Sequence, residues 1–284
     1  MSEESKIRDT ADAVKGIVEA IPIYQDALQP AVIEIGQGLQ TVAKTIHIAL
    51  APISALVWGY DQIKEFVSIR VSEKLKDVPQ ENITTPKPNI AGPALEALKY
   101  TGHDENLQEM YANLLATSMD SRTADGAHPA FVEIIRQLTS DEARLVRLFI
   151  RPRALPLINV RWEYKKETPT ERGGQDLLSN FSLLGYEAGC QLPDLTPTYI
   201  NNLCRLGLAD IPTFLEYTAQ GIYDPLENHP TVLALKNRLE NDEKRKFEIE
   251  RKGLQVSALG KQFCKACVLS HEQKGLPKKA RANE

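Results

Sequence analysis

The sequence lacks the short signatures by which common catalytic sites are identified. It contains no Gly-x-Ser-x-Gly nucleophile elbow and no phosphate-binding P-loop. Its five histidines include no pair four residues apart, which excludes the helical zinc-binding motif. These absences leave open only an enzyme whose active site is assembled from distant segments. We therefore expect no catalytic residues and no cofactor, while a dispersed active site stays an alternative.

Cysteine is scarce and confined to the second half of the chain, at Cys190, Cys204, Cys264 and Cys267. The last two have the CxxC spacing of zinc and redox sites, but a zinc site needs four ligands and no second CxxC is present. Because the pair falls inside a predicted helix, we interpret it as part of the hydrophobic core. The chain opens with Met-Ser-Glu-Glu-Ser rather than a basic secretory region, so we expect a cytoplasmic protein with reduced thiols.

Charge is distributed unevenly along a chain of otherwise ordinary globular composition. Residues 1–150 contain 14 Lys and Arg against 21 Asp and Glu, a net charge of −7. Residues 151–284 contain 20 against 17, a net charge of +3. This change supports a domain boundary near residue 150. A net charge of +3 falls short of the basic footprint of a dedicated nucleic-acid-binding protein.

Apolar residues recur at three- and four-residue intervals through residues 1–77, which predicts amphipathic helices in a bundle or hairpin array. Residues 41–60 are the most apolar part and reach the length of a membrane span, although Lys44 and Pro52 interrupt them. We interpret them as a helix buried in a bundle or an oligomer interface, with conditional membrane insertion as the alternative. The candidate residues of this face are Ile46, Leu50, Ile53, Val57 and Trp58.

A helical domain is predicted for residues 78–150. Four prolines predict an extended loop over residues 78–93. An apolar stripe at helical spacing predicts a helix over residues 104–119. Thr139 and Glu142 have the spacing of a capping box, which predicts the start of a further helix.

From residue 151 the pattern changes to short strands and helices in the order of a winged helix. We predict a winged-helix-like α+β domain over residues 151–272, in which residues 212–252 form a long insertion in place of an ordinary wing. A basic tail follows at residues 273–284. The expected strands are 154–164, 208–211 and 253–258, and the expected helices are 175–184, 197–206, 226–252 and 260–270. The predicted fold class is therefore mainly α, with helices preceding an α+β second half.

The helix predicted over residues 197–206 carries the candidate DNA-contact residues. Thr196 is expected to be its N-cap, and Gly207 is placed to end it. Asn and Arg side chains can read base edges in the major groove of DNA. An ordinary solvated face or a protein-docking surface explains the same side chains, and few basic residues flank them. The candidates are Thr198, Asn201, Asn202 and Arg205.

Several short sequence segments in the first half of the chain resemble those of a known family. They are Pro22-Ile-Tyr-Gln-Asp26, residues 49–53 with 57–60, residues 86–89 with 91–98, and residues 109–116. In this order they resemble the abortive infection alpha family, most specifically over residues 20–150 and more loosely beyond. The resemblance implies a bacterial protein of antiphage defence that acts through growth arrest or death of the infected cell. It implies no catalytic residues that can be placed on this chain.

Two hypotheses of function follow from these patterns. The first is a defence-associated interaction or effector protein that binds a protein partner or a second copy of itself, or perturbs a membrane. It predicts that a charge at Ile46, Leu50 or Ile53 abolishes defence. The second is a winged-helix DNA-binding regulator, for which Asn201→Ala and Arg205→Ala weaken a salt-sensitive binding to DNA.

Overall fold

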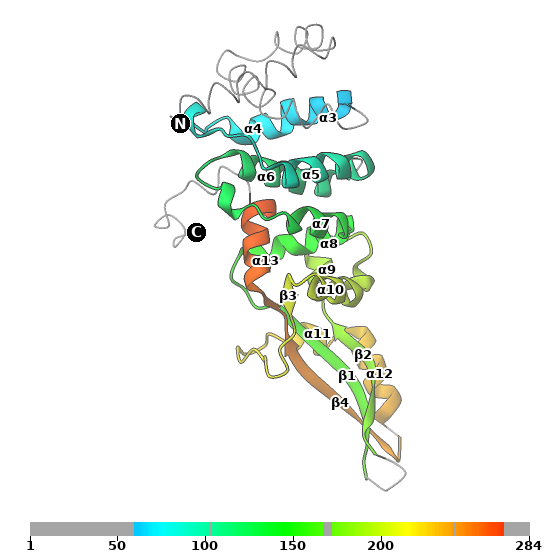
Figure 1. The fold of residues 1–284 in the computed structure, drawn as a ribbon. Helices are drawn as coiled ribbons and strands as arrows, with labels where there is room; N and C mark the ends of the chain where they lie inside the picture. Colours follow the sequence, from blue (N-terminus) through cyan, green and yellow to red (C-terminus); the bar gives the residue numbers. More distant parts are fainter. Residues whose placement is uncertain (1–59, 103, 167–171, 241, 270–284) are drawn as a thin grey trace.

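The computed structural model describes residues 60–102, 104–166, 172–240 and 242–269, which form a stack of helical layers that ends in a β-sheet arm (Figure 1). The layers, in order, are α3 (Tyr60–Phe66) with α4 (Ser72–Leu75), α5 (Pro88–Thr101) with α6 (Glu105–Met119), α7 (Ala130–Arg136) and α8 (Ser140–Val146) with α13 (Ala258–Phe263), and α9 (Leu184–Glu187) with α10 (Thr196–Arg205). Short turns of other helix types complete them: η3 (Val67–Val71), η4 (Gln80–Asn82), η5 (Ala124–Gly126), η6 (Arg147–Ile150), η7 (Pro193–Leu195) and η8 (Cys264–Val268).

Two small antiparallel sheets complete the described part of the chain. The arm contains β1 (Pro156–Tyr164) between β2 (Gly174–Phe181) and β4 (Arg245–Gly253), with α11 (Asp224–Glu227) and α12 (Pro230–Glu240) beside it. The second sheet pairs β3 (Ala209–Asp210) with β5 (Gln255–Val256). The described chain is thus rich in helix, with strands confined to its second half, as predicted for the fold class. The predicted N-terminal bundle concerns residues that are mostly outside the described ranges.

One hydrophobic core runs through the helical layers from Ile63 to Cys267. Helix α6 lies at its centre, since every residue from Met110 to Met119 is buried. Two polar side chains of α6 also bind the last described turn of the chain. Asn113 Nδ2 donates to the Cys267 carbonyl oxygen (3.0 Å), and Thr117 Oγ1 donates to that of Ala266 (2.9 Å). The last described turn, η8, is therefore joined to α6.

The two cysteines of the CxxC sequence lie in this core. Cys264 and Cys267 are buried, and neither forms a disulfide. Burial raises the pKa of the Cys264 thiol to about 12. Such a thiol is protonated at neutral pH and is a poor nucleophile. The interpretation of the pair as core residues is confirmed.

The arm has a small core of its own. Ile158 and Val160 of β1 are buried against Tyr223, Leu226 and Val232 from the segment that holds α11 and α12. Successive residues of a strand point to opposite faces, so the alternate residues of β1 face away from these helices. One face of the arm is therefore apolar and covered by helices, and the other is polar.

Two segments predicted as helices are strands. Residues 175–184 instead contribute most of β2, and the last part of the predicted helix 226–252 is β4. In β4 the apolar residues Phe247 and Ile249 alternate with charged ones, which is the period of a half-buried strand. Both segments contain residues that favour helices when considered locally. Backbone pairing with β1 overrides this preference, with Val160 opposite Leu178 on one side and Ile249 on the other.

The predicted proline-rich loop is shorter than expected. Helix α5 begins at Pro88, so the prediction of a loop over residues 78–93 is wrong for its last six residues. Proline is well tolerated at the first helical position, where its missing amide has no partner within the helix. Pro93 lies inside α5, whose apolar face is buried in the core. Packing therefore stabilises a helix that the proline count alone disfavours.

The capping box predicted at the start of α8 is present. Thr139 Oγ1 accepts from the Glu142 amide (3.2 Å), and Glu142 Oε2 accepts from the Thr139 amide (2.6 Å). Thr139→Ala is expected to lower the free energy of unfolding by about 1 kcal/mol, because one helix amide loses its acceptor. Urea denaturation measures this, with Thr139→Ser, which retains the hydroxyl, as the control. Equal stability of the alanine variant and the wild type would contradict the prediction.

Candidate interaction surface

Asp141 joins the start of α8 to the segment between α9 and α10. The residue is only 5% exposed. Its Oδ1 accepts from the Gln191 amide (2.8 Å) and from Arg144 Nη1 (2.9 Å). Its Oδ2 accepts from the Leu192 amide (2.9 Å) and from the Tyr199 hydroxyl (3.1 Å). One side chain thus satisfies two loop amides and fastens α10 to α8.

These donors control the protonation of Asp141. Burial raises the pKa of a carboxyl group, but the Gln191 and Leu192 amides, the Tyr199 hydroxyl and Arg144 together outweigh it and hold the pKa of Asp141 below its ordinary value. The carboxylate is therefore charged at neutral pH and makes strong charge-assisted hydrogen bonds. Burial, with the bond to Asp141, also raises the pKa of Tyr199 to about 12, so its hydroxyl remains a donor.

A second acidic residue of α8 binds the side of α10. Glu142 Oε1 accepts from Asn202 Nδ2 (2.7 Å), which also donates to the Gln137 carbonyl oxygen (3.1 Å). Arg205 Nη2 donates to Gln137 Oε1 (3.0 Å). Helix α10 is thus held by polar contacts as well as by its buried apolar face. That face was predicted, and the structure confirms it for Tyr199, Ile200 and Leu203.

The turn before α10 packs closely on Gly185 of α9. A β-carbon at Gly185 would lie 2.0 Å from Thr196 Oγ1 and 3.1 Å from the Pro193 carbonyl oxygen, so only glycine allows this approach. Thr196 is the first residue of α10 rather than its N-cap, and the N-cap prediction is therefore wrong. Because η7 leads directly into α10, the buried Thr196 hydroxyl donates to the Pro193 carbonyl oxygen instead.

Three large apolar side chains of this segment face solvent. Tyr186, Leu192 and Leu195 are 52%, 59% and 45% exposed. They are neighbours, because the Leu195 amide donates to the Leu192 carbonyl oxygen (3.1 Å) and the Tyr186 hydroxyl donates to Asp194 Oδ1 (2.6 Å). We call these three residues the α9–η7 surface. The backbone beneath them is held by Asp141 and Gly185, so a fixed structure presents them to solvent.

Charged side chains of both signs border the α9–η7 surface. Arg153, which precedes β1, pairs with Glu187 of α9 through both terminal guanidinium nitrogens: Nη1 donates to Oε1, and Nη2 donates to Oε2 at 2.7 Å. Asp194 is exposed and accepts the hydrogen bond from the Tyr186 hydroxyl. An apolar centre with a charged and polar border is the usual composition of a protein-binding surface.

The predicted DNA-contact residues lie on α10, beside this surface (Figure 1). Thr198, Asn201 and Arg205 are exposed, whereas Asn202 is half-buried. Asn201 Oδ1 accepts from Asn180 Nδ2 of β2 (3.1 Å). Asn202 and Arg205 both contact the turn between α7 and α8. Three of the four side chains are thus exposed, and Asn201, Asn202 and Arg205 bind neighbouring segments of the chain.

The predicted membrane or oligomer face lies outside the described residues. It comprises Ile46, Leu50, Ile53, Val57 and Trp58. Among the helices that the structure describes, none combines the length and the apolar character needed to cross a bilayer.

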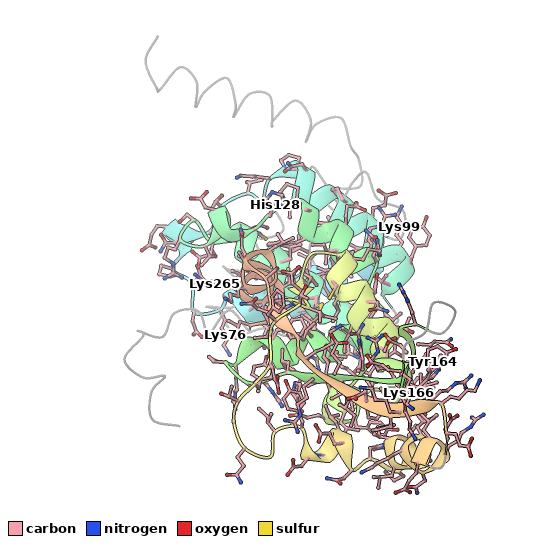
Figure 2. All side chains as sticks on the ribbon, turned by 90° about the horizontal axis from the view of Figure 1, so that it is seen from below. Lys76, Lys99, His128, Tyr164, Lys166 and Lys265 are labelled. Carbon is pink, nitrogen blue, oxygen red and sulfur yellow. The ribbon has the colours of Figure 1, made fainter. Side chains whose placement is uncertain are left out.

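The arm carries a second group of aromatic and basic side chains. The Arg245 guanidinium lies 4.4 Å from the centre of the Trp162 ring, and the Tyr164 ring meets that ring edge-on at 5.1 Å. Tyr164 and Lys166 lie together at the side of the molecule formed by the arm (Figure 2). Carboxylates alternate with these cations. For example, Glu163 of β1 forms an ion pair with Lys246 of β4. The described strands β1 and β4 therefore alternate charges of both signs at this position, rather than the single positive charge that suits a phosphate backbone.

Comparison with known proteins places the chain in a family. A family model described as abortive infection alpha matches residues 59–267, which is well over half of the chain. The chain belongs to the abortive infection alpha family. The match confirms the resemblance noted in the sequence. The matched region begins after the segments at residues 22–26 and 49–53. It also extends through the second half of the chain, where we expected a looser resemblance.

One solved structure is similar to part of this abortive infection alpha protein. It is that of an uncharacterized protein from the hydrocarbon-degrading marine bacterium Alcanivorax borkumensis SK2, with 23% sequence identity and a TM-score of 0.32. The similarity covers 47% of this chain and 89% of the other. No curated protein matches the chain.

No motif of this abortive infection alpha protein marks the α9–η7 surface. Leu192 and Leu195 lie in a proline-containing segment and belong to no helical stripe, which is the one available signal that they are exposed. Asp141 is conspicuous only as a residue inside the capping box, because its loop contacts lie about fifty residues further along the chain. Within the described ranges, no group of three or more His, Cys, Asp or Glu residues is arranged to hold a metal ion.

Proposed function

We propose that this abortive infection alpha protein acts in antiphage defence, inside the cytoplasm, by binding a protein partner through the α9–η7 surface. Family membership supports the role in abortive infection. The exposure of Tyr186, Leu192 and Leu195 on a fixed backbone supports the binding, and it is the observation that carries the proposal. Apolar groups already ordered in the free protein lose little conformational freedom when a partner covers them.

A charge placed in the centre of the surface tests the proposal. Leu192→Asp is expected to abolish protection against phage, because loss of a central anchor costs about 2 kcal/mol and weakens binding about thirtyfold. The measurement is the plating efficiency of phage on cells that express each variant at equal levels.

The matched control is another exposed leucine. Leu233 of α12 is 37% exposed and lies far along the chain from this surface, so Leu233→Asp is expected to protect like the wild type. Circular dichroism of both variants establishes that they fold. Full protection by Leu192→Asp would sink the proposal.

DNA binding through α10 is the alternative function. The succession of α9, α10 and β3, and later of β5 and α13, supports a winged-helix-like arrangement with α10 in the position of a recognition helix. Strand β1, by contrast, pairs with β2 and β4 in a separate sheet from β3 and β5. The exposure of Thr198 and Asn201 favours this alternative, whereas the contacts of Asn202 and Arg205 with the α7–α8 turn disfavour it. In the same phage assay, a DNA-binding protein would be sensitive to Asn201→Ala and insensitive to Leu192→Asp.

Conditional membrane insertion of residues 41–60 is a separate route to cell death. It rests on their apolar sequence alone. Fractionation of cells before and after infection distinguishes it from partner binding, because only insertion transfers the protein to the membrane fraction.

A further inference from the structure

A cavity of about 240 Å³ lies where three parts of the helical stack meet. It is lined by Phe66 at the end of α3, by Arg70 of η3, by the beginning of α6 and by Arg147 at the start of η6. Its volume is below the roughly 300–1,000 Å³ of sites that hold drug-sized ligands. The cavity therefore suits a small ligand only.

Two arginines of this cavity have no carboxylate partner. Among the described residues, Arg70 forms no ion pair, and Arg147 donates to an uncharged group, Asn106 Oδ1 (2.7 Å). Guanidinium groups bind carboxylates and phosphates through paired, charge-assisted hydrogen bonds. Two such groups at one cavity indicate that its ligand carries an anionic group.

The guanidinium of Arg147 is held in place by the start of α6. Asn106, whose Oδ1 accepts from Arg147, donates its backbone amide to Asp104 Oδ1 (2.9 Å). Its Nδ2 donates to Ser140 Oγ of α8 (2.7 Å). A cation that is already oriented loses little conformational freedom when a ligand binds, which favours binding.

The two acidic residues of the cavity differ in their surroundings. Glu109 pairs with Lys74, so its charge is compensated. Glu105 is exposed and has no ion-pair partner among the residues that the structure describes. Its carboxylate would repel a ligand that carried negative charge alone, and would attract a ligand amino group. The free charges of the cavity thus require both signs on the ligand.

We propose that this cavity binds a small zwitterion of the α-amino acid class. The ligand carboxylate is bound by Arg70 and Arg147, its ammonium group pairs with Glu105, and Phe66 contributes an apolar wall for its side chain. The cavity belongs to other layers of the stack than the α9–η7 surface (Figure 1). A failure of this proposal would therefore leave the one made for that surface intact.

Isothermal titration calorimetry of the full chain with the common L-amino acids, each titrated separately, tests the proposal. At least one of them is expected to bind. Its analogues that lack either charged group are expected to bind at least about tenfold more weakly, because each loses a charge-assisted contact. For L-phenylalanine these analogues are phenethylamine and 3-phenylpropanoate. Absence of binding by every amino acid, or equal binding of either analogue, would refute the proposal.

Three substitutions locate the binding in this cavity. Arg70→Gln, Arg147→Gln and Glu105→Gln each remove one charge from an exposed side chain, so the fold is expected to persist, which circular dichroism verifies. Each is expected to weaken binding of the amino acid roughly tenfold or more. Arg238→Gln changes an exposed arginine of α12 and is expected to have no effect. Binding that survives Glu105→Gln, or inorganic phosphate that binds more tightly than any amino acid, would rule out a zwitterion.

Discussion

Replacing Asp141 by alanine is expected to lower the free energy of unfolding by about 3–5 kcal/mol. The substitution removes the acceptor of two backbone amides, of the Tyr199 hydroxyl and of Arg144 in a site that is nearly closed to water. Each buried donor left without a partner retains its full cost of desolvation. Equilibrium denaturation in urea measures the effect, as a shift of the transition midpoint.

The control for this experiment is an aspartate on the surface. Asp125 is exposed, and Asp125→Ala is expected to change the free energy of unfolding by less than about 0.5 kcal/mol. If Asp141→Ala proved no more harmful than Asp125→Ala, the assigned role of the buried carboxylate would be wrong.

The same site makes the stability of the protein depend on pH in acid. The pKa of Asp141 is lower in the folded protein than in the unfolded chain, so its contribution to stability is fully present above the unfolded pKa of about 3.9. That contribution is lost as the pH falls through the lower pKa of the folded state. Asp141→Asn cannot titrate, so the difference in stability between the wild type and Asp141→Asn is expected to shrink below pH 4. A difference that stays constant there would contradict the low pKa.

Gly260→Ala is expected to destabilise the protein by about 3 kcal/mol or more. The added β-carbon would lie 2.0 Å from the Leu208 carbonyl oxygen, and 2.9 Å from its carbonyl carbon. Both atoms belong to the backbone, so they cannot move aside as a flexible side chain would. The same carbonyl oxygen accepts from the Ser257 amide where α13 meets the segment before β3. Thermal and urea denaturation measure the effect.

At a glycine with open space around it, substitution by alanine is expected to raise the free energy of unfolding instead of lowering it. In α5, a β-carbon at Gly92 would meet no atom within 4 Å. Gly92→Ala is therefore expected to stabilise the protein by about 0.5–1 kcal/mol, the usual preference of a helix for alanine. Comparing the two variants separates the clash from helix propensity, since Gly260 also lies in a helix. Equal effects of the two substitutions would show that the contact with Leu208 is not decisive.

The features predicted correctly depend on groups that are close together in the chain. The capping box joins residues three apart, and Gly207 ends α10 with a positive φ of 73° that glycine adopts without strain. The buried face of α10 follows from apolar spacing within three turns. The incorrect N-cap at Thr196 has the same explanation, because its hydroxyl responds to the fold of η7 on Gly185 rather than to its own helix.

From the amino-acid sequence alone, the positions of α6, α8, α10 and β1 follow, because periodicity and capping act within a few residues. Tertiary structure was needed to decide that residues 174–181 and 245–253 are strands, since their hydrogen-bond partners lie in β1. It also decided which leucines stay exposed. Leu192 does not differ in chemistry from a core leucine. Its side chain remains in solvent because Asp141, distant in sequence, holds its backbone amide in the buried layer below.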